Sequence, residues 1–301
     1  MIKKTSVQCP AKINLFLEIT GKRPDGYHRL KTLFAKINVY DVLDLSLASG
    51  LGGPELLVED SEATSALSAG PDNLVMRAAN LFFKAFDVKV GVRLSLKKRI
   101  PIGAGLGGGS SDAAGALLGL GKLLGLDSGR AVYRKKIFEL ARGLGADVPF
   151  FVQSHSFSLG EGIGDRLSPV KISHSLPYLI LVFPGVSIST KESYQALPLP
   201  ERKDVLTRLS QLDRLTEALL RGESVEEWGN LLFNRLEDSK VSARPIVHGA
   251  LDILRKLGLL GVRMSGSGSS VFGFCRSYAE GEKILSKLKI YPWKSFLTSC
   301  Q

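Results

Sequence analysis

The sequence predicts a globular protein of mixed class, in which β-strands and α-helices alternate along the chain. Length, composition and hydrophobic periodicity predict it. The 301 residues suffice for one large domain or for two domains of ordinary size. The contents of 44% hydrophobic and 23% charged residues are typical of a chain that buries a core. The periodicity of the apolar residues changes several times between the strand repeat and the helix repeat.

Strand signals open the chain and are followed by a helix. Apolar residues alternate over 12–21 and 41–48, which predicts two strands. Apolar residues repeat at helical spacing over 72–86, and Asp72 is of a type that caps helix N-termini. The clearest strand signal lies over 88–98, where five apolar residues alternate with others: Val88, Val90, Val92, Leu94 and Leu96.

Two helices are predicted after the glycine-rich stretch that follows this strand. The first, over 110–125, is rich in small residues and can pack closely against a sheet. The second, over 128–145, has Ser128 as a candidate cap and ends near Gly145. The second half of the chain predicts strands near 155–160 and 177–184, a helical block over 201–258, two strands around a turn in 259–275, a helix over 277–290 and a strand over 293–299.

The chain is basic, with 40 Lys and Arg against 29 Asp and Glu, a formal charge of +11. Nucleic-acid binding is one interpretation of this charge. We favour a soluble enzyme with acidic ligands, because the charges are scattered and no basic helix with interleaved aromatic residues is present. The densest basic run, at 97–99, lies beside the glycine-rich stretch.

The cysteines and the N-terminus predict a cytoplasmic protein outside the membrane. Cys9, Cys275 and Cys300 form no CxxC pair, and their number is odd, which argues against a disulfide framework. The basic and then apolar start of the chain resembles a signal peptide faintly, but Pro10 and Lys12 interrupt it. The four histidines show no metal-binding spacing.

The glycine-rich stretch over 103–111 predicts an anion site. It lies between a strand and a helix N-terminus, where main-chain NH groups lack partners and the helix dipole adds positive charge. Ser110 and Ser111 can cap the helix and offer hydroxyls to a phosphate or its metal ion. The usual P-loop is excluded because no Lys follows the last glycine. A Rossmann fingerprint lacks its acidic partner, and a flexible connector is the remaining alternative.

Five segments resemble the galactokinase, homoserine kinase, mevalonate kinase and phosphomevalonate kinase (GHMP) superfamily. The segment PIGAGLGGGSSDAA at 101–114 resembles its phosphate loop, and MSGSGSSVFGF at 264–274 resembles its third motif. The segments at 10–30, 145–151 and 183–194 resemble the branch that acts on cytidine-diphospho-methylerythritol. Arg235 departs from the pattern of that branch, which places an acidic or small residue there, and the segment 160–165 is looser than its pattern.

The resemblance implies an α+β fold of two lobes with the active site between them. We place the ATP-binding and catalytic domain at 1–153 and the C-terminal GHMP-type substrate domain at 154–301, although the composition changes little there. The implied reaction transfers the γ-phosphate of ATP to the 2-hydroxyl of cytidine-diphospho-methylerythritol, a step of the non-mevalonate isoprenoid precursor pathway. Another GHMP kinase, or a non-catalytic nucleotide- or nucleic-acid-binding protein, is the alternative.

The resemblance assigns catalysis to Lys12 and Asp147. Phosphoryl transfer requires an acceptor hydroxyl in line and neutralisation of the charge on the transferred group. Asp147 can accept the hydroxyl proton, and Lys12 can hold the developing alkoxide and the γ-phosphate. By residue type and spacing alone, both are ordinary charged residues.

The resemblance implies ATP and Mg²⁺ as cofactors. Asn73 could equally be a helix-start residue, and Asp112, a candidate Mg²⁺ ligand together with Ser111, could instead complement the helix dipole. The ATP contacts implied are Pro101, Ile102, Gly103, Ala104, Gly105, Leu106, Gly107, Gly108, Gly109, Ser110, Ser111, Asn73 and Lys98.

The acceptor is expected to be a cytidine-diphosphate sugar alcohol, bound by a monomer or a homodimer. The resemblance places Tyr27 and Tyr194 against the cytosine ring and His28 in hydrogen bonding to it, whereas a solvated turn and a core aromatic are the alternatives. The turn at 266–268 could equally be a plain hairpin. The acceptor contacts implied are Asn14, Tyr27, His28, Thr190, Tyr194, Gly266 and Ser267.

Overall fold

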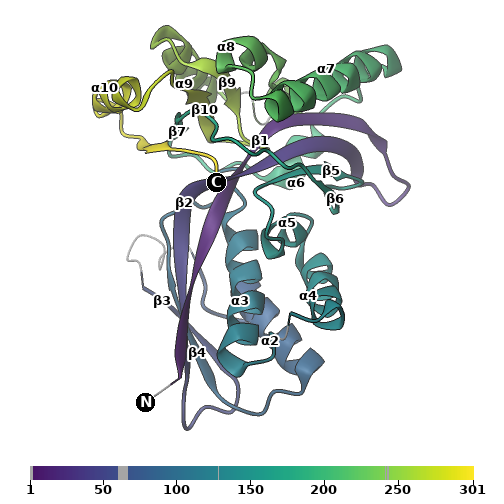
Figure 1. Ribbon diagram of the computed structural model, residues 1–301, viewed down its shortest axis with the longest axis vertical. Helices are drawn as coiled ribbons and strands as arrows, with labels where there is room; N and C mark the ends of the chain where they lie inside the picture. The colour runs from purple at the N-terminus through teal and green to yellow at the C-terminus, as the bar shows by residue number, and fades with distance from the viewer. Residues whose placement is uncertain (1–2, 60–66, 128, 241, 243) are drawn as a thin grey trace. The chain divides into compact units, whose positions relative to one another are not determined.

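The computed structural model describes residues 3–59, 67–127, 129–240, 242 and 244–301 (Figure 1). Its contacts divide the chain into two compact units. The first unit comprises residues 1–11, 39–102 and 107–154, and the second comprises residues 12–38, 103–106 and 155–301. The boundary at 153/154 stays a prediction. One crossing between the units lies next to it, whereas the crossings at 11/12, 38/39, 102/103 and 106/107 had no signal in the composition.

Two long strands contribute residues to both units. β1 (Lys4–Lys22) and β2 (His28–Leu47) extend well beyond the predicted strands over 12–21 and 41–48. They belong to a sheet whose strand order is β3-β4-β2-β1-β8, with β5 (Phe157–Glu161) on β2 and β6 (Arg166–Pro169) on β5. The short strand β8 (Phe233–Asn234) pairs parallel to β1.

In the first unit, β3 (Pro54–Val58) lies parallel to β4 (Val92–Lys97), which pairs antiparallel with the end of β2. The prediction of a strand over 88–98 is wrong at its start. Asp87, in the left-handed conformation, and the Val88 amide, which donates to the Phe83 carbonyl, still close α2, so the ladder begins only at Val92. A Cβ at Gly91 would lie 2.5 Å from the carbonyl oxygens of Ala48 and Leu51, so only glycine fits there. Val90 continues the alternation in sequence but is 45% exposed.

Helix α2 (Leu74–Phe86) confirms the helix predicted over 72–86, but its cap differs. The side chain of Asn73, and not that of Asp72, accepts a hydrogen bond from the Val75 amide at 2.9 Å. Helix α4 (Ala131–Leu144) begins after Arg130, and the predicted cap Ser128 lies outside the described residues.

Helix α3 (Gly108–Leu124) packs on β1 and β2, as its small residues predict. A Cβ at Gly115 would lie 2.4 Å from the Cys9 sulfur, and a Cβ at Gly119 would lie 2.6 Å from Leu45. Glycine is therefore required for the close approach of this helix to the strands. The short helix α5 (Val148–Val152) follows α4 and contacts both α3 and α4.

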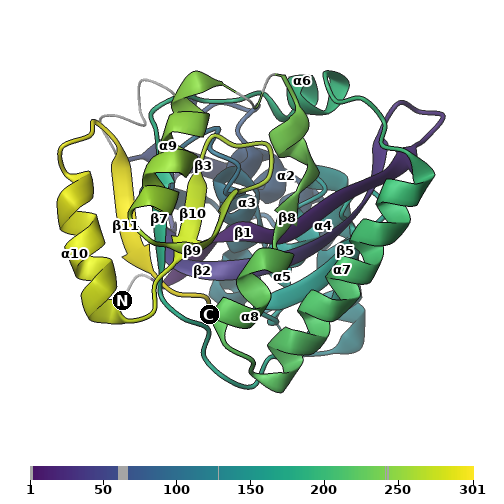
Figure 2. The ribbon, with the colours of Figure 1, turned by 90° about the horizontal axis from the view of Figure 1, so that it is seen from above.

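In the second unit, β11 (Lys294–Thr298), β7 (Leu179–Phe183), β10 (Val271–Phe274) and β9 (Leu260–Met264) form an antiparallel sheet in that order. Helices α9 (Pro245–Lys256) and α10 (Tyr278–Leu288) lie alongside it (Figure 2). The β9–β10 pair confirms the two strands predicted in 259–275. The unit also holds α6 (Thr190–Gln195), α7 (Arg202–Arg221), α8 (Val225–Trp228) and the 3₁₀ turns Gly229–Leu231 and Arg235–Asp238.

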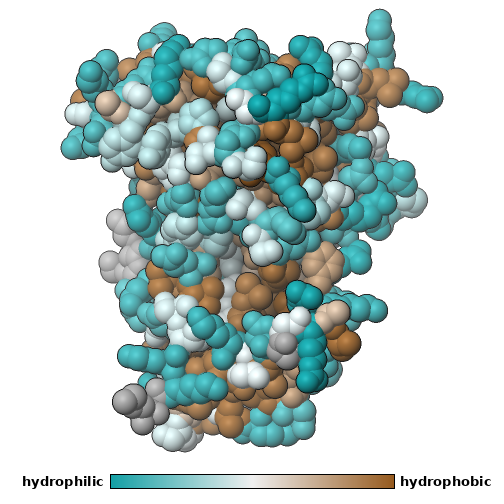
Figure 3. All heavy atoms as spheres, in the orientation of Figure 1, coloured by the Kyte–Doolittle hydropathy of each residue, from teal (hydrophilic) through white to brown (hydrophobic). Residues whose placement is uncertain are grey.

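Among the described residues, no helix is long and apolar enough to span a membrane. Hydrophilic side chains cover much of the face in Figure 3, with smaller apolar areas between them. Cys9, Cys275 and Cys300 are free thiols, as their number and spacing predict.

Candidate active site

Hydrogen bonds to its main-chain carbonyls hold the part of the glycine loop that lies in the second unit, residues 103–106. The Lys12 amide donates to the Leu106 carbonyl at 2.9 Å, and the Ser265 hydroxyl donates to the Gly105 carbonyl at 3.0 Å. Gly105 has φ +75°, and a Cβ there would lie 2.1 Å from the Ser265 carbonyl oxygen. Only glycine fits this position, both for its backbone conformation and for its contact with the 264–268 turn.

The part of the loop in the first unit leads directly into α3. Gly107, in the left-handed conformation, is the N-cap, and no side chain caps the helix. The prediction that Ser110 or Ser111 caps α3 is therefore wrong: the helix begins at Gly108, so both serines lie inside its first turn. The Ser111 hydroxyl is buried and has no hydrogen-bond partner among the described residues.

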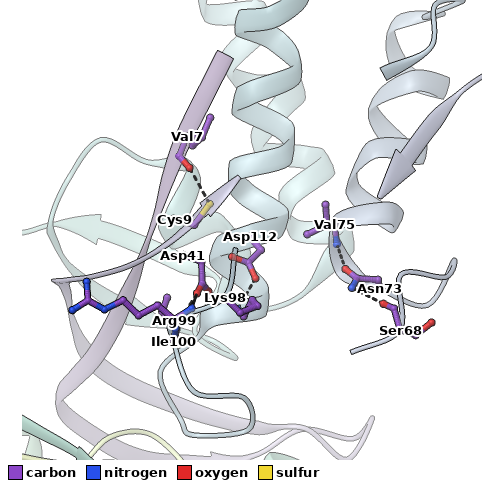
Figure 4. A network of polar contacts seen from close by, with 10 residues as sticks. All are labelled: Val7, Cys9, Asp41, Ser68, Asn73, Val75, Lys98, Arg99, Ile100 and Asp112. Atoms are coloured by element: carbon purple, nitrogen blue, oxygen red, sulfur yellow. Dashed lines mark hydrogen bonds and ion pairs between the residues drawn. The ribbon is translucent and has the colours of Figure 1, made fainter. Parts of the chain in front are cut away.

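The charged cluster, formed by Asp41, Lys98 and Asp112, lies beside this helix start (Figure 4). The Lys98 ammonium donates to the carboxylates of Asp41 and Asp112, the latter at 2.7 Å. Asp41 also accepts from the amides of Arg99, at 2.5 Å, and Ile100, at 2.8 Å. The cluster ties the segment before the glycine loop to β2 and to α3.

Burial shifts the pKa of Asp112 in the charged cluster upward, to about 7, with the nearby Lys98 opposing and Asp41 adding to the shift. Burial opposes the charged form of Lys98, but the two carboxylates raise its pKa above the ordinary value. Burial, together with Asp112 and Asp41, also raises the pKa of the Cys9 thiol, which makes this cysteine unreactive.

The Lys12 relay, formed by Lys12, Asn14, Thr32 and the Phe16 carbonyl, lies in the second unit. The Lys12 ammonium donates to Asn14 Oδ1 at 2.6 Å, and Asn14 Nδ2 donates to Thr32 Oγ1 at 2.7 Å. The Thr32 hydroxyl donates to the Phe16 carbonyl at 2.6 Å. The predicted residues Lys12 and Asn14 thus share one face of β1, as their spacing of two indicates.

The turn at 264–268 closes over this relay. A Cβ at Gly266 would lie 3.1 Å from the Lys12 ammonium and 3.3 Å from Asn14 Oδ1. Asn234 Nδ2 donates to the carbonyls of Met264 and Gly266, both at 2.8 Å. The predicted residue Gly266 therefore lies beside Lys12.

The residues predicted to bind the acceptor base also lie in the second unit. The rings of His28 and Tyr194 are 5.5 Å apart between centroids, and Tyr27 is 62% exposed on the β1–β2 turn. Burial, and to a smaller extent Lys22, lowers the pKa of His28, which is therefore neutral at pH 7. The hydroxyls of Thr190 and Ser267 are 3.0 Å apart.

The remaining predicted residues lie in the first unit. Asp147 immediately precedes α5, so it belongs to a different unit from Lys12. Asn73 donates from Nδ2 to the Ser68 carbonyl at 2.8 Å while capping α2. Lys98 is nearly buried in the charged cluster, and its predicted adenine contact stays a prediction.

Sequence reasoning missed several residues that shape the site. Thr32 could have been found, because a Thr in a strand that pairs with the strand of the predicted catalytic lysine can orient its neighbours. Asp41 and Asn234 had no local signal, since their partners are 57 and 30 residues away in sequence. Arg235, the departure from the family pattern, is explained by a two-point ion pair with the buried Glu18 at 2.7 and 2.8 Å.

Two family models match the chain and define its class. The model "GHMP kinases N terminal domain" matches residues 73–155, and "GHMP kinases C terminal" matches residues 215–292. The structure of homoserine kinase from Cytophaga hutchinsonii superposes with a TM-score of 0.75 at 19% identity, which shows the shared fold. The expected α+β fold of the GHMP kinases is confirmed.

The relatives narrow the class further. The 4-diphosphocytidyl-2-C-methyl-D-erythritol kinase of Citrifermentans bemidjiense is 38% identical over 92% of this chain and 91% of its own. That of Caldicellulosiruptor saccharolyticus is 36% identical over 96% and 94%. A crystal structure of a 4-(cytidine 5'-diphospho)-2C-methyl-D-erythritol kinase has a TM-score of 0.76 at 33% identity, covering 98% of this chain and 99% of its own. The chain therefore belongs to the 4-diphosphocytidyl-2-C-methyl-D-erythritol kinase family.

Proposed function

We propose that this protein transfers the γ-phosphate of ATP to the 2-hydroxyl of 4-diphosphocytidyl-2-C-methyl-D-erythritol. Family membership supports the reaction. The observation that carries the proposal is the placement of the Lys12 ammonium. It lies between the Asn14 carbonyl oxygen and the backbone of Gly266, beside the loop residues 103–106.

Lys12 and Asp147 perform the chemistry in this proposal. Lys12 neutralises charge on the transferred phosphoryl group and on the developing alkoxide. Asp147 accepts the proton of the acceptor hydroxyl as the new oxygen–phosphorus bond forms. Asn14 holds the Lys12 ammonium in a fixed direction, so little reorganisation is required when charge develops.

ATP and Mg²⁺ are the proposed cofactors. The glycine loop offers main-chain NH groups at the start of α3, where a phosphate is favoured. Ser111 Oγ and Asp112 Oδ1 are buried oxygens without a hydrogen-bond partner among the described residues, and oxygen donors suit Mg²⁺. When bound, Mg²⁺ neutralises the phosphate charge. The described residues contain no cluster of three or more His, Cys, Asp or Glu that could hold a metal.

Tyr27, His28 and Tyr194 are proposed to bind the cytosine. The neutral His28 can donate one hydrogen bond and accept another, which suits the edge of a base. The exposed Tyr27 ring and the Tyr194 ring offer stacking surfaces. Thr190 and Ser267, joined by their hydroxyls, offer further donors to the acceptor.

Release of ADP from the purified protein with Mg-ATP tests the proposal. The cytidine compound is compared with homoserine, mevalonate and galactose as acceptors. ADP formed only with the cytidine compound is the expected result. ADP formed only with another acceptor would refute the assignment of the substrate, and no ADP with any of them would refute the kinase activity.

His28→Ala is expected to raise the KM for the cytidine acceptor about tenfold or more, because a buried polar contact to the base is lost. The KM for ATP should stay within about twofold of the wild-type value. Steady-state kinetics with each substrate varied in turn measure both constants. A change in the KM for ATP alone would show that His28 does not contact the acceptor.

A further inference from the structure

We propose that Thr32 is a positioning residue for phosphoryl transfer, which fixes the amide of Asn14 so that its carbonyl oxygen faces the Lys12 ammonium. This inference rests on the proposed function for its kinetic consequence. Its structural part rests on the Lys12 relay alone, whose three side chains are nearly inaccessible to water: Lys12 is 5%, Asn14 1% and Thr32 0% exposed.

The direction of each hydrogen bond in the relay follows from its two ends. The Phe16 carbonyl can only accept, so the Thr32 hydroxyl, 2.6 Å away, gives its single proton to it. Thr32 Oγ1 can then only accept from Asn14, 2.7 Å away. Asn14 must therefore turn its NH₂ group toward Thr32, which leaves its carbonyl oxygen for Lys12.

The other end of the relay demands the same orientation. An ammonium has three donors and no acceptor, so only the carbonyl oxygen of Asn14 can bond it at 2.6 Å. An Asn amide turned by half a rotation would place its NH₂ group against the ammonium and leave a buried donor unsatisfied. Thr32 excludes that rotamer because its own proton is already committed to the Phe16 carbonyl.

The ammonium is also restrained from its other sides. It lies 5.5 Å from the centroid of the Phe34 ring, on the same face of β2 as Thr32. The Gly266 backbone lies close to it, because a Cβ added at this position would lie only 3.1 Å from the ammonium nitrogen. A change in the direction of the Asn14 oxygen would therefore move the reactive nitrogen within a tightly packed space, and a misplacement of about 1 Å costs on the order of 10²-fold in rate.

Thr32→Val and Thr32→Ser test the kinetic part. Valine keeps the shape but removes the hydroxyl, so kcat should fall about tenfold or more while the KM for ATP changes by less than about threefold. Serine keeps the hydroxyl and should restore kcat to within about threefold of the wild-type value. Thr216→Val removes a half-buried hydroxyl that, like that of Thr32, donates to a main-chain carbonyl, here that of Leu212 in α7, and should leave kcat unchanged.

Three kinetic results with the Thr32 variants would overturn the inference: a Thr32→Val protein as fast as the wild type, a Thr32→Ser protein as slow as Thr32→Val, or a loss that appears only in the KM for ATP. Thr216→Val with the same loss as Thr32→Val would do so too.

An NMR measurement on the wild-type protein without substrates separates this inference from the proposed function. The Asn14 side-chain amide resonances, assigned by their disappearance in Asn14→Ala, should show one proton protected from exchange with solvent by its bond to Thr32. Thr32→Ser should retain the protection. Exchange of both protons at the rate of an exposed asparagine would refute the relay, even if Thr32→Val did not fold. Absence of turnover in the wild-type protein would refute the proposed function and leave this measurement decisive for Thr32.

Discussion

The charged cluster and the Lys12 relay both bury a lysine, but the partners of the lysine are carboxylates in the cluster and neutral groups in the relay. In the charged cluster, Lys98 lies between two carboxylates, and Asp41 also binds two main-chain amides. In the Lys12 relay, the bonds run through a neutral amide, a hydroxyl and a carbonyl.

This difference separates two tasks. A buried ion pair leaves an uncompensated charge when one member is removed, so Asp41 and Lys98 are both needed for stability. Neutral hydrogen bonds contribute less each, but their donor and acceptor order fixes directions. We infer that the charged cluster holds the segments around the start of α3 in place, and that the relay orients the Lys12 ammonium.

Asp41→Ala should break the charged cluster with the largest effect, a loss of about 3–5 kcal/mol in the free energy of unfolding. It removes a partner of the buried Lys98 and the acceptor of two amides. Urea unfolding at pH 7 measures the loss. Asp44→Ala is the matched control on the same strand, because its exposed ion pair with Lys97 should contribute less than about 1 kcal/mol. Equal losses in the two variants would contradict the account.

Lys36, on β2, is a third buried lysine, and Lys36→Met extends the comparison to it. Burial lowers the pKa of Lys36 to about 8, so below that pH the folded state carries a charge whose burial is unfavourable. The folded state binds fewer protons than the unfolded state between about pH 8 and the ordinary lysine pKa, so stability rises with pH in that window.

Methionine removes this penalty, so the change in unfolding free energy that it causes should be more favourable at pH 7 than at pH 10, by about 1–2 kcal/mol. Urea unfolding at both pH values measures it. Lys31→Met, which replaces an exposed lysine of the same strand, should change stability by less than about 0.5 kcal/mol. A gain from Lys36→Met that grows with pH would show the sign to be wrong.

Asp112→Asn should have the smallest effect, a loss of about 1 kcal/mol or less at pH 7. Burial already raises the pKa of Asp112 to about 7, and asparagine can still accept from Lys98 through its carbonyl oxygen. The same unfolding experiment, in metal-free buffer, compares it with Asp41→Ala. A loss as large as that of Asp41→Ala would show that the two carboxylates support Lys98 equally.

The sequence predicted those parts of the fold that depend on local patterns. The predicted close packing of α3 and the predicted β9–β10 strand pair are confirmed, because both depend on residues that are neighbours in sequence. The strand over 88–98 was predicted too long, since alternation continues through Val88 and Val90 although the Val88 amide still belongs to the end of α2. The caps were misassigned because several residues of capping type stand side by side, and geometry chooses among them.

The site was predicted in its parts but not in its assembly. Lys12 and Asn14 have the spacing of one strand face, and structure and prediction agree there. The hydrogen bonds from Asn14 to Thr32 and from Lys98 to Asp41 join residues 18 and 57 apart in sequence, which the fold brings together. Local pattern carries no information on such partners, and the family resemblance supplied roles for single residues rather than their connections.

Lys12→Met tests the central claim, that the relay serves chemistry and the charged cluster serves the fold. Turnover of the cytidine acceptor, followed as ADP release, and urea unfolding are measured on the same preparation. We predict a fall in kcat of about 10² or more and a change in unfolding free energy within about 1 kcal/mol. Retained turnover, or a loss of turnover accompanied by a loss of stability as large as that of Asp41→Ala, would contradict the account.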